Sequence, residues 1–192
     1  MWPRVTRLVR VRQKLLAAVG YLYKHVADRP GWLTAAHVAD VYSFSGCVSK
    51  PFADYIDYWK HNGYWLFNSP REITELANAA SISLEGLKLF YYEAYELQFD
   101  EDEKAWEAFE PWSATEVVAP ISKKLEGFDI ASFTMGNIAD CSPLSCNSLA
   151  SSVPTNAHCL LGSFEEAKAI VEGGGLEGCE PGPYRVVAVY SV

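Results

Sequence analysis

Residues 87–99 read LKLFYYEAYELQF, and this stretch decides the fold class of the second half of the chain. Apolar and polar side chains alternate along it, a period of two that is typical of a β-strand with one buried face. One face carries Leu87, Leu89, Tyr91, Tyr95, Leu97 and Phe99, and the other carries Lys88, Glu96 and Gln98. The acidic run at 100–103 predicts a turn, and AWEAF at 105–109 predicts a returning strand, so we expect an antiparallel hairpin.

Three further elements are expected beyond this hairpin. They are a strand at 128–136, a helix at 164–172 that opens at an S-F-E-E capping box, and a last strand, YRVVAVYSV, at 184–192. The sequence therefore predicts an α+β region over residues 84–192. We expect an antiparallel or mixed sheet of about four or five strands, one packed helix, and a loop at 137–158 rich in Ser, Pro and Asn.

The first half of the chain has a helical pattern instead. Apolar residues recur at intervals of three and four between Lys14 and Val26, as on an amphipathic helix. The later elements expected are a short helix after Thr34, a helix at 49–61, a strand at 64–67 and a capped helix from Ser69 to about Ala80. No internal repeat is evident in the sequence.

This order of helix, helix, turn, helix and strand resembles a winged helix-turn-helix domain over residues 14–67. The resemblance implies a winged-helix-like region at 14–83 that follows a basic leader at 1–13. In that family the third helix enters the major groove of DNA. Lys50 and Lys60 would then contact a partner, so a DNA-binding regulator is one alternative function.

Charge is distributed unevenly along the chain. The net charge is −8, although residues 1–14 contain five basic residues and no acid. An acidic body repels phosphate and disfavours nonspecific nucleic-acid binding. No apolar run has the roughly 18–20 residues that a membrane span needs. Five cysteines, an odd number spread widely, indicate reduced thiols, so we expect a cytoplasmic protein.

The stretch CSPLSCNSLASSVPTNAHC, from Cys141 to Cys159, holds the best candidates for chemistry. A zinc site would use Cys141 and Cys146, with His158 or Cys159 as a further ligand and Cys179 as a possible fourth. The spacing of these residues is imperfect for structural zinc. We therefore expect no bound cofactor, with zinc as the metal to test.

Two other chemical roles and one structural role remain open for this stretch. A redox disulfide would join Cys141 to Cys146. A nucleophilic Cys146, or Cys141, would take His158 as its base, with Asn156 orienting that base. In the structural alternative the cysteines are small buried apolar residues, and the asparagines hold the loop through backbone hydrogen bonds.

The acidic turn is a second candidate for binding. Glu101, Asp102 and Glu103 would dock on a basic partner, or else keep a hairpin edge solvated. Aromatic residues make up 14% of the chain, and such residues anchor interfaces as well as filling cores. We therefore expect a protein-binding or regulatory module without catalysis. A cysteine-dependent enzyme or thiol/metal site and a DNA-binding regulator are the alternatives.

Overall fold

The computed structural model describes residues 16–109, 116–134 and 138–192, so the basic leader at 1–13 lies outside the described residues. The strands are β1 (Leu16–His25), β2 (Ala27–Asp28), β3 (Asp40–Val41), β4 (Lys50–Pro51), β5 (Lys88–Tyr95), β6 (Leu97–Asp100), β7 (Ala105–Ala108), β8 (Lys124–Ser132) and β9 (Tyr184–Ser191). The helices are α1 (Pro70–Ala80), α2 (Phe164–Glu172) and two 3-10 turns, η1 (Tyr55–Asp57) and η2 (Leu149–Ser151).

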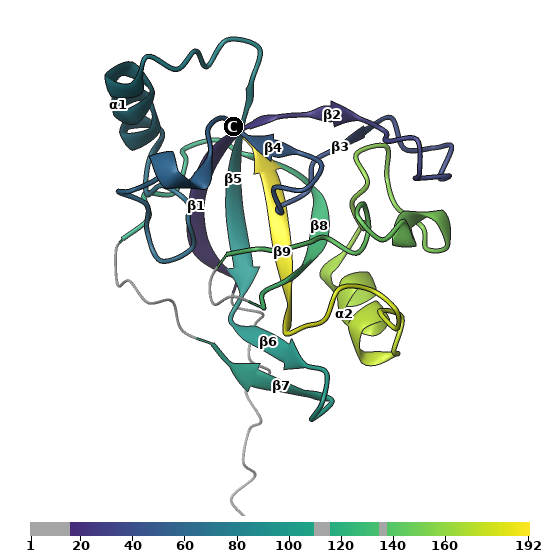
Figure 1. The fold of residues 1–192 in the computed structure, drawn as a ribbon. Helices are drawn as coiled ribbons and strands as arrows, with labels where there is room; N and C mark the ends of the chain where they lie inside the picture. Colours follow the sequence, from purple (N-terminus) through teal and green to yellow (C-terminus); the bar gives the residue numbers. More distant parts are fainter. Residues whose placement is uncertain (1–15, 110–115, 135–137) are drawn as a thin grey trace, which may run out of the picture.

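Seven of these strands form one antiparallel sheet, and β2 and β3 form a small ribbon beside it. Strand β9 lies in the middle, with β5 and β6 along one edge and β8 along the other. Strand β1 pairs with the far edge of β5. Figure 1 shows that the sheet is strongly curved, with α1 beyond its β1 side and α2 beyond its β8 side. The centre of β9 is buried on both faces, as its apolar sequence predicts.

The winged-helix expectation is wrong, because the first half is built mainly of strands and loops. The segment predicted as a helix at 14–26 is the long strand β1. Residues Val19 to Leu22 are all buried, so both faces of the strand need apolar side chains and the period of two is lost. A short apolar run of this kind cannot be distinguished from a buried helix by periodicity.

The second and third predicted helices are also absent. The segment after Thr34 continues into β3, and the segment 49–61 contains only β4 and the single turn η1. The apolar residues that suggested the third helix pack as loop residues. Phe52 stacks on Tyr58 with ring centroids 5.4 Å apart, and both rings contact Phe67. The expected strand at 64–67 is reduced to a single bridge to β1.

Elements whose ends carry capping residues form as predicted. Helix α1 begins after Ser69, whose hydroxyl accepts a hydrogen bond from the Glu72 N–H. Helix α2 begins at the complete capping box of Ser163 and Glu166. The terminal strand β9 is also present. The predicted hairpin forms only in part, because the segment 87–99 is divided into β5 and β6 and only β6 pairs with β7. The sheet has seven strands instead of four or five.

The structure also contains an internal repeat that the sequence did not show. Gly20 in β1 and Gly127 in β8 each sit at a bulge with positive φ, +138° and +150°. A Cβ atom on Gly20 would lie 2.7 Å from Leu66 Cβ, and one on Gly127 would lie 2.7 Å from Leu160 Cβ. Each leucine belongs to a loop that pairs with its strand through one β-bridge of two backbone hydrogen bonds. The bridges join Tyr21 to Phe67 and Phe128 to Leu161.

An asparagine holds each of these loops in the same way. Asn62 Nδ2 donates to the Val19 carbonyl at 2.8 Å, and Asn156 Nδ2 donates to the Glu126 carbonyl at 2.7 Å. The Oδ1 atom of each asparagine accepts two backbone N–H groups, two and four residues further on. A serine-capped helix, α1 or α2, follows each loop. The described part of the chain therefore contains two copies of a strand, loop, helix and strand unit, and the β6–β7 hairpin follows the first copy.

A pseudo-twofold axis relates the two copies and passes between β5 and β9. Tyr92 is the cross-strand partner of Gly20, and Val189 is the partner of Gly127. Tyr92 and Val189 also face each other in the β5–β9 pair. Equivalent residues that pair with each other are the signature of an isologous, twofold contact. The repeat places the loop after β1 and the loop after β8 in equivalent positions.

Neither α-helix in the described part of the chain is long and apolar enough to cross a bilayer.

Candidate metal centre

Three cysteines from the two equivalent loops meet at one point. The sulfur atoms of Cys47, Cys141 and Cys146 all lie within 4.8 Å of one another. Cys47 follows β3 in the first repeat, and the other two follow β8 in the second. Cys47 is exposed, Cys146 is half-buried and Cys141 is buried. The Cys47 thiol donates to the Asp140 carbonyl at 2.9 Å, which ties the two loops together beside the cluster.

A buried lysine holds the loop that carries Cys47. Lys24, on β1, is fully buried, and its ammonium donates to three successive carbonyl oxygens. Those acceptors are Ser43 at 2.5 Å, Phe44 at 3.1 Å and Ser45 at 2.6 Å. An ammonium group has three donors, so these carbonyls account for all of them. The lysine fixes the backbone of this loop just before Cys47.

A buried carboxylate joins this loop to the second one. Asp129, on β8, accepts from the Ser43 hydroxyl at 3.0 Å and the Phe44 N–H at 2.7 Å. Its other oxygen accepts from the Ser142 hydroxyl at 2.5 Å. Ser142 in turn starts the tight turn that leads to Cys146, whose N–H donates to the Ser142 carbonyl. Buried networks of this kind rigidify a site when every member has its partners.

Burial, hydrogen bonds and neighbouring charges shift the pKa values of the ionisable groups in and beside this network. Burial raises the pKa of Asp129 to about 6, opposed by hydrogen bonds from Ser142, Phe44 and Ser43. Burial lowers the pKa of Lys24 to about 7, opposed by the charge of Asp129. Hydrogen bonds from the other two cysteines are the main cause of a strongly lowered pKa at the Cys47 thiol. Cys47 can form a thiolate only by giving up the hydrogen bond from its thiol to the Asp140 carbonyl.

The structure places only part of the sequence-predicted site in this cluster. Cys141 and Cys146 belong to it, whereas His158 does not. His158 Nδ1 lies 2.6 Å from Asp40 Oδ1, and its ring stacks on Tyr42 at 4.0 Å. Asn156 was expected to orient this histidine ring. Its side chain instead forms backbone hydrogen bonds that hold the loop containing both residues.

The two remaining cysteines also lie apart from the cluster. Cys159 is buried in the apolar core and Cys179 is half-buried. Cys47, Lys24 and Asp129 are the site residues that sequence reasoning missed. One signal could have pointed to Cys47, because SFSGC (43–47) and SPLSC (142–146) both place two serines shortly before a cysteine.

The residues expected to bind a partner are scattered over the surface. Lys50 is exposed in β4, and Lys60 borders a groove beside α1. Asp102 and Glu103 lie in the turn between β6 and β7, where their N–H groups donate to Asp100. Glu101 accepts from the Gly182 N–H at 2.6 Å. Glu101 therefore ties the turn to the segment before β9, whereas Asp102 and Glu103 are exposed.

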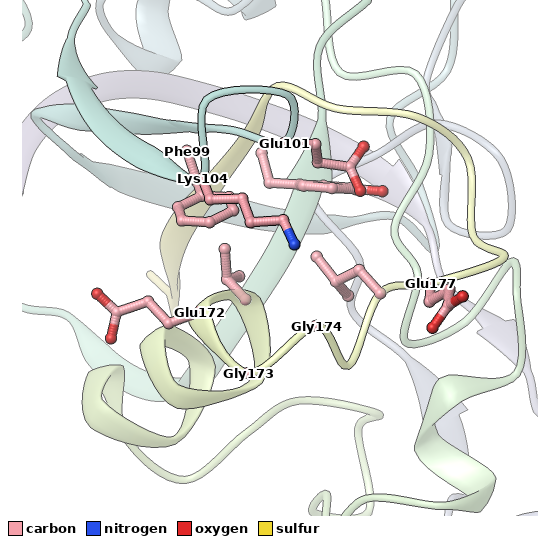
Figure 2. Close-up of a pocket in the computed structure, with 10 residues that line it drawn as sticks. Phe99, Glu101, Lys104, Glu172, Gly173, Gly174 and Glu177 are labelled. Atoms are coloured by element: carbon pink, nitrogen blue, oxygen red, sulfur yellow. The ribbon is translucent and has the colours of Figure 1, made fainter.

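Glu101 also lines a pocket of about 410 Å³ between the β6–β7 turn and the end of α2. Figure 2 shows the Lys104 side chain reaching across this pocket toward the segment after α2. Glu172 and Glu177 complete its charged lining. None of the three clustered cysteines lines this pocket.

A more apolar groove of about 550 Å³ lies beside α1 and η1. Trp59 borders it with 85% of its surface exposed, and Phe67 and Leu76 lie within it. Its charged lining is mostly acidic: Asp57, Glu72 and Glu75 together with Lys60. Nearby Ile56 is 80% exposed. Trp59 and Ile56 are therefore two large apolar side chains left exposed beside one groove.

No protein-family model matches the chain, and no curated protein or solved structure shows significant similarity to it.

Proposed function

We propose that this protein binds one thiophilic metal ion, zinc, through Cys47, Cys141 and Cys146. The observation that supports this function is the convergence of the three sulfur atoms within 4.8 Å. Zinc–sulfur bonds of about 2.3 Å in tetrahedral geometry place two sulfurs about 3.8 Å apart. A contraction of about 1 Å at most would close the cluster on the ion.

The ligand chemistry supports a metal that prefers soft sulfur ligands, and we propose zinc. Soft thiolates select zinc, copper(I) and iron–sulfur clusters. An iron–sulfur cluster is held by four cysteine thiolates, one more than this group provides. Among the described residues, no histidine, aspartate or glutamate lies within the cluster as a fourth ligand. A water molecule or a small ligand would take the fourth position.

The charge around the cluster suits a zinc ion held by three thiolates. Zinc with three thiolates carries a net charge of −1, and the Lys24 ammonium interacts favourably with charges on both Cys47 and Cys146. The ion would also join the two repeats, because Cys47 comes from one and Cys141 and Cys146 from the other. We propose that the metal stabilises the contact between the loops and that the loops hold the metal.

Metal analysis of the full chain, purified under reducing conditions, tests this proposal. We expect about one zinc per chain by mass spectrometry of the metal, and a tetrahedral thiolate spectrum after exchange with cobalt(II). Cys47→Ser, Cys141→Ser and Cys146→Ser each lower the metal content. Cys179→Ser is the matched control and retains it. Wild-type protein that neither contains nor takes up zinc would disprove the proposal.

A second function, docking of another protein, is favoured by the groove at Trp59. Its apolar floor and its acidic lining at Glu72 and Glu75 fit a segment with apolar residues flanked by Lys or Arg. A photo-cross-linker in place of Trp59 should label such a segment in a partner, and Asp57→Lys with Glu75→Lys should abolish the labelling. Labelling that is unaffected by charge reversal would contradict this role.

A further inference from the structure

The three clustered thiols differ in their access to solvent, and this difference indicates a second property of the site. Cys47 is exposed, Cys146 is half-buried, and Cys141 is buried and contacts Asn147 Oδ1 at 3.6 Å. A small oxidant therefore reaches Cys47 first. Of the two thiols near Cys47, Cys146 is the more accessible.

We propose that hydroperoxides oxidise Cys47 and Cys146 to a disulfide that expels the metal ion. The inference rests on the proposed function, since it assigns a control mechanism to the same site. The sulfur atoms lie within 4.8 Å, and a disulfide bond is about 2.05 Å long. Rotation of the two side chains, with a small backbone shift at the exposed Cys47, would close this distance.

The reaction balances in two steps. The Cys47 sulfur attacks one peroxide oxygen, an S–O bond forms, and the O–O bond breaks. The departing oxygen takes the electron pair and a proton from water, which leaves a sulfenic acid on Cys47. The Cys146 sulfur then attacks the Cys47 sulfur, an S–S bond forms, and the sulfenic oxygen leaves as water.

In the zinc-loaded protein, Cys47 and Cys146 are already deprotonated because both would bind the metal as thiolates. The net change therefore consumes one hydrogen peroxide and two protons from solvent, and it yields one disulfide, one zinc ion and two waters. Two electrons pass from the sulfurs to the peroxide. Cys141 remains as the single thiolate of the cluster, which is insufficient to hold zinc. A small-molecule dithiol would reduce the disulfide and restore the site.

The other cysteines provide internal controls for this assignment. Cys159 is only 2% exposed within the apolar core, and Cys179 lies outside the cluster. Neither should enter the disulfide. A disulfide between Cys47 and Cys146 would also link the two repeats covalently.

Peroxide treatment of the zinc-loaded full chain tests the inference. Zinc release is followed with a chromophoric chelator, and disulfides are mapped by peptide mass spectrometry after free thiols are blocked. We expect stoichiometric release together with a Cys47–Cys146 disulfide, both reversed by dithiothreitol and zinc. Cys179→Ser should behave like wild type. The apoprotein of Cys146→Ser should instead accumulate a sulfenic acid on Cys47 that dimedone traps.

The outcomes separate this inference from the proposed function. A protein that binds zinc through the three cysteines but forms another disulfide, or only sulfinic acids, keeps the function and overturns the inference. A protein that binds no zinc overturns both the function and the expulsion step. The apoprotein is mapped in parallel, and absence of the Cys47–Cys146 bond there overturns the thiol chemistry itself.

Discussion

Lys24 and Asp129 hold the same two loop residues through groups of opposite polarity. The lysine donates to the carbonyl oxygens of Ser43 and Phe44, and the aspartate accepts from the hydroxyl of Ser43 and the N–H of Phe44. The dipeptide is therefore fixed from both sides in a fully buried position. Because the chain reaches Cys47 three residues later, this arrangement determines where the exposed thiol lies.

Removal of the lysine ammonium should loosen the site without removing a ligand. We expect Lys24→Met to lower zinc affinity by about 10- to 100-fold, as changes to groups that orient metal ligands commonly do. Lys50→Met, at an exposed position in β4, is the control and should bind zinc like wild type. Competition with a calibrated chelator measures both affinities. Equal affinities for the two variants would show that Lys24 does not position the thiols.

The buried carboxylate should give the apoprotein a distinct pH dependence. The pKa of Asp129 is raised from 3.8 to about 6, so the folded state favours its protonated form. Its contribution to stability is therefore fully present below about pH 4 and is lost as the pH rises through about 6. The loss amounts to about 3 kcal/mol at most.

Chemical denaturation of the wild-type apoprotein and of Asp129→Asn between pH 4 and 7 measures this effect. The free energy of unfolding of the wild type, relative to the variant, should decrease across this range. The comparison cancels the titrating groups that do not interact with Asp129, and Lys24, whose pKa of about 7 depends on the Asp129 charge, titrates at the upper end of this range. A constant difference, or one that increases with pH, would mean that Asp129 is not held in its protonated form by burial.

The two bulge glycines should be equally intolerant of a side chain. Alanine at Gly20 or Gly127 combines a positive φ with a Cβ atom 2.7 Å from a leucine Cβ. We expect each substitution to lower the free energy of unfolding by about 3 kcal/mol. Gly31→Ala, where nothing lies within 4 Å of the added atom, should change it little. Thermal and denaturant unfolding of the three variants would reveal whether the repeats share this constraint.

His158 and Asn156 should affect stability and leave the thiols unchanged. His158→Ala removes a contact with Asp40 and a ring stack on Tyr42. Asn156→Ala removes three hydrogen bonds of the repeat loop and should cost about 2–4 kcal/mol. Both variants should keep wild-type thiol reactivity toward a disulfide reagent such as dithionitrobenzoate. A marked loss of reactivity in His158→Ala would instead support a Cys–His pair.

The sequence was informative where local chemistry determines an element. Ser69 and Ser163 mark the starts of α1 and α2. Each capping hydroxyl accepts a hydrogen bond from an N–H group only three residues further along the chain, so the signal is local in the sequence. It was uninformative for β1, where burial of both faces removes the alternation that identifies a strand. The repeat was missed because its shared residues are few. They are the bulge glycine and, after loops of different length, an asparagine, a leucine and a serine at positions 62, 66 and 69 and again at 156, 160 and 163.

The candidate site was predictable only in part for a related reason. Cys141 and Cys146 lie in one loop, and their proximity in the sequence drew attention to it. Cys47 lies in the other repeat, so only the twofold arrangement brings it to the same point. The helical interpretation of 49–61 further concealed it, because that interpretation treated the preceding segment as a simple turn.

The twofold pairing of β5 with β9 has a consequence for how the chain could be divided. Each repeat contributes one outer and one inner strand to the row β1, β5, β9 and β8. A polypeptide cut between Phe109 and Glu116 would leave two fragments, each with an unpaired inner strand that fits the other. Such fragments should reassemble as complementary halves. Zinc binding by the thiol cluster would show that the fragments have assembled, because Cys47 lies on one fragment and Cys141 and Cys146 lie on the other.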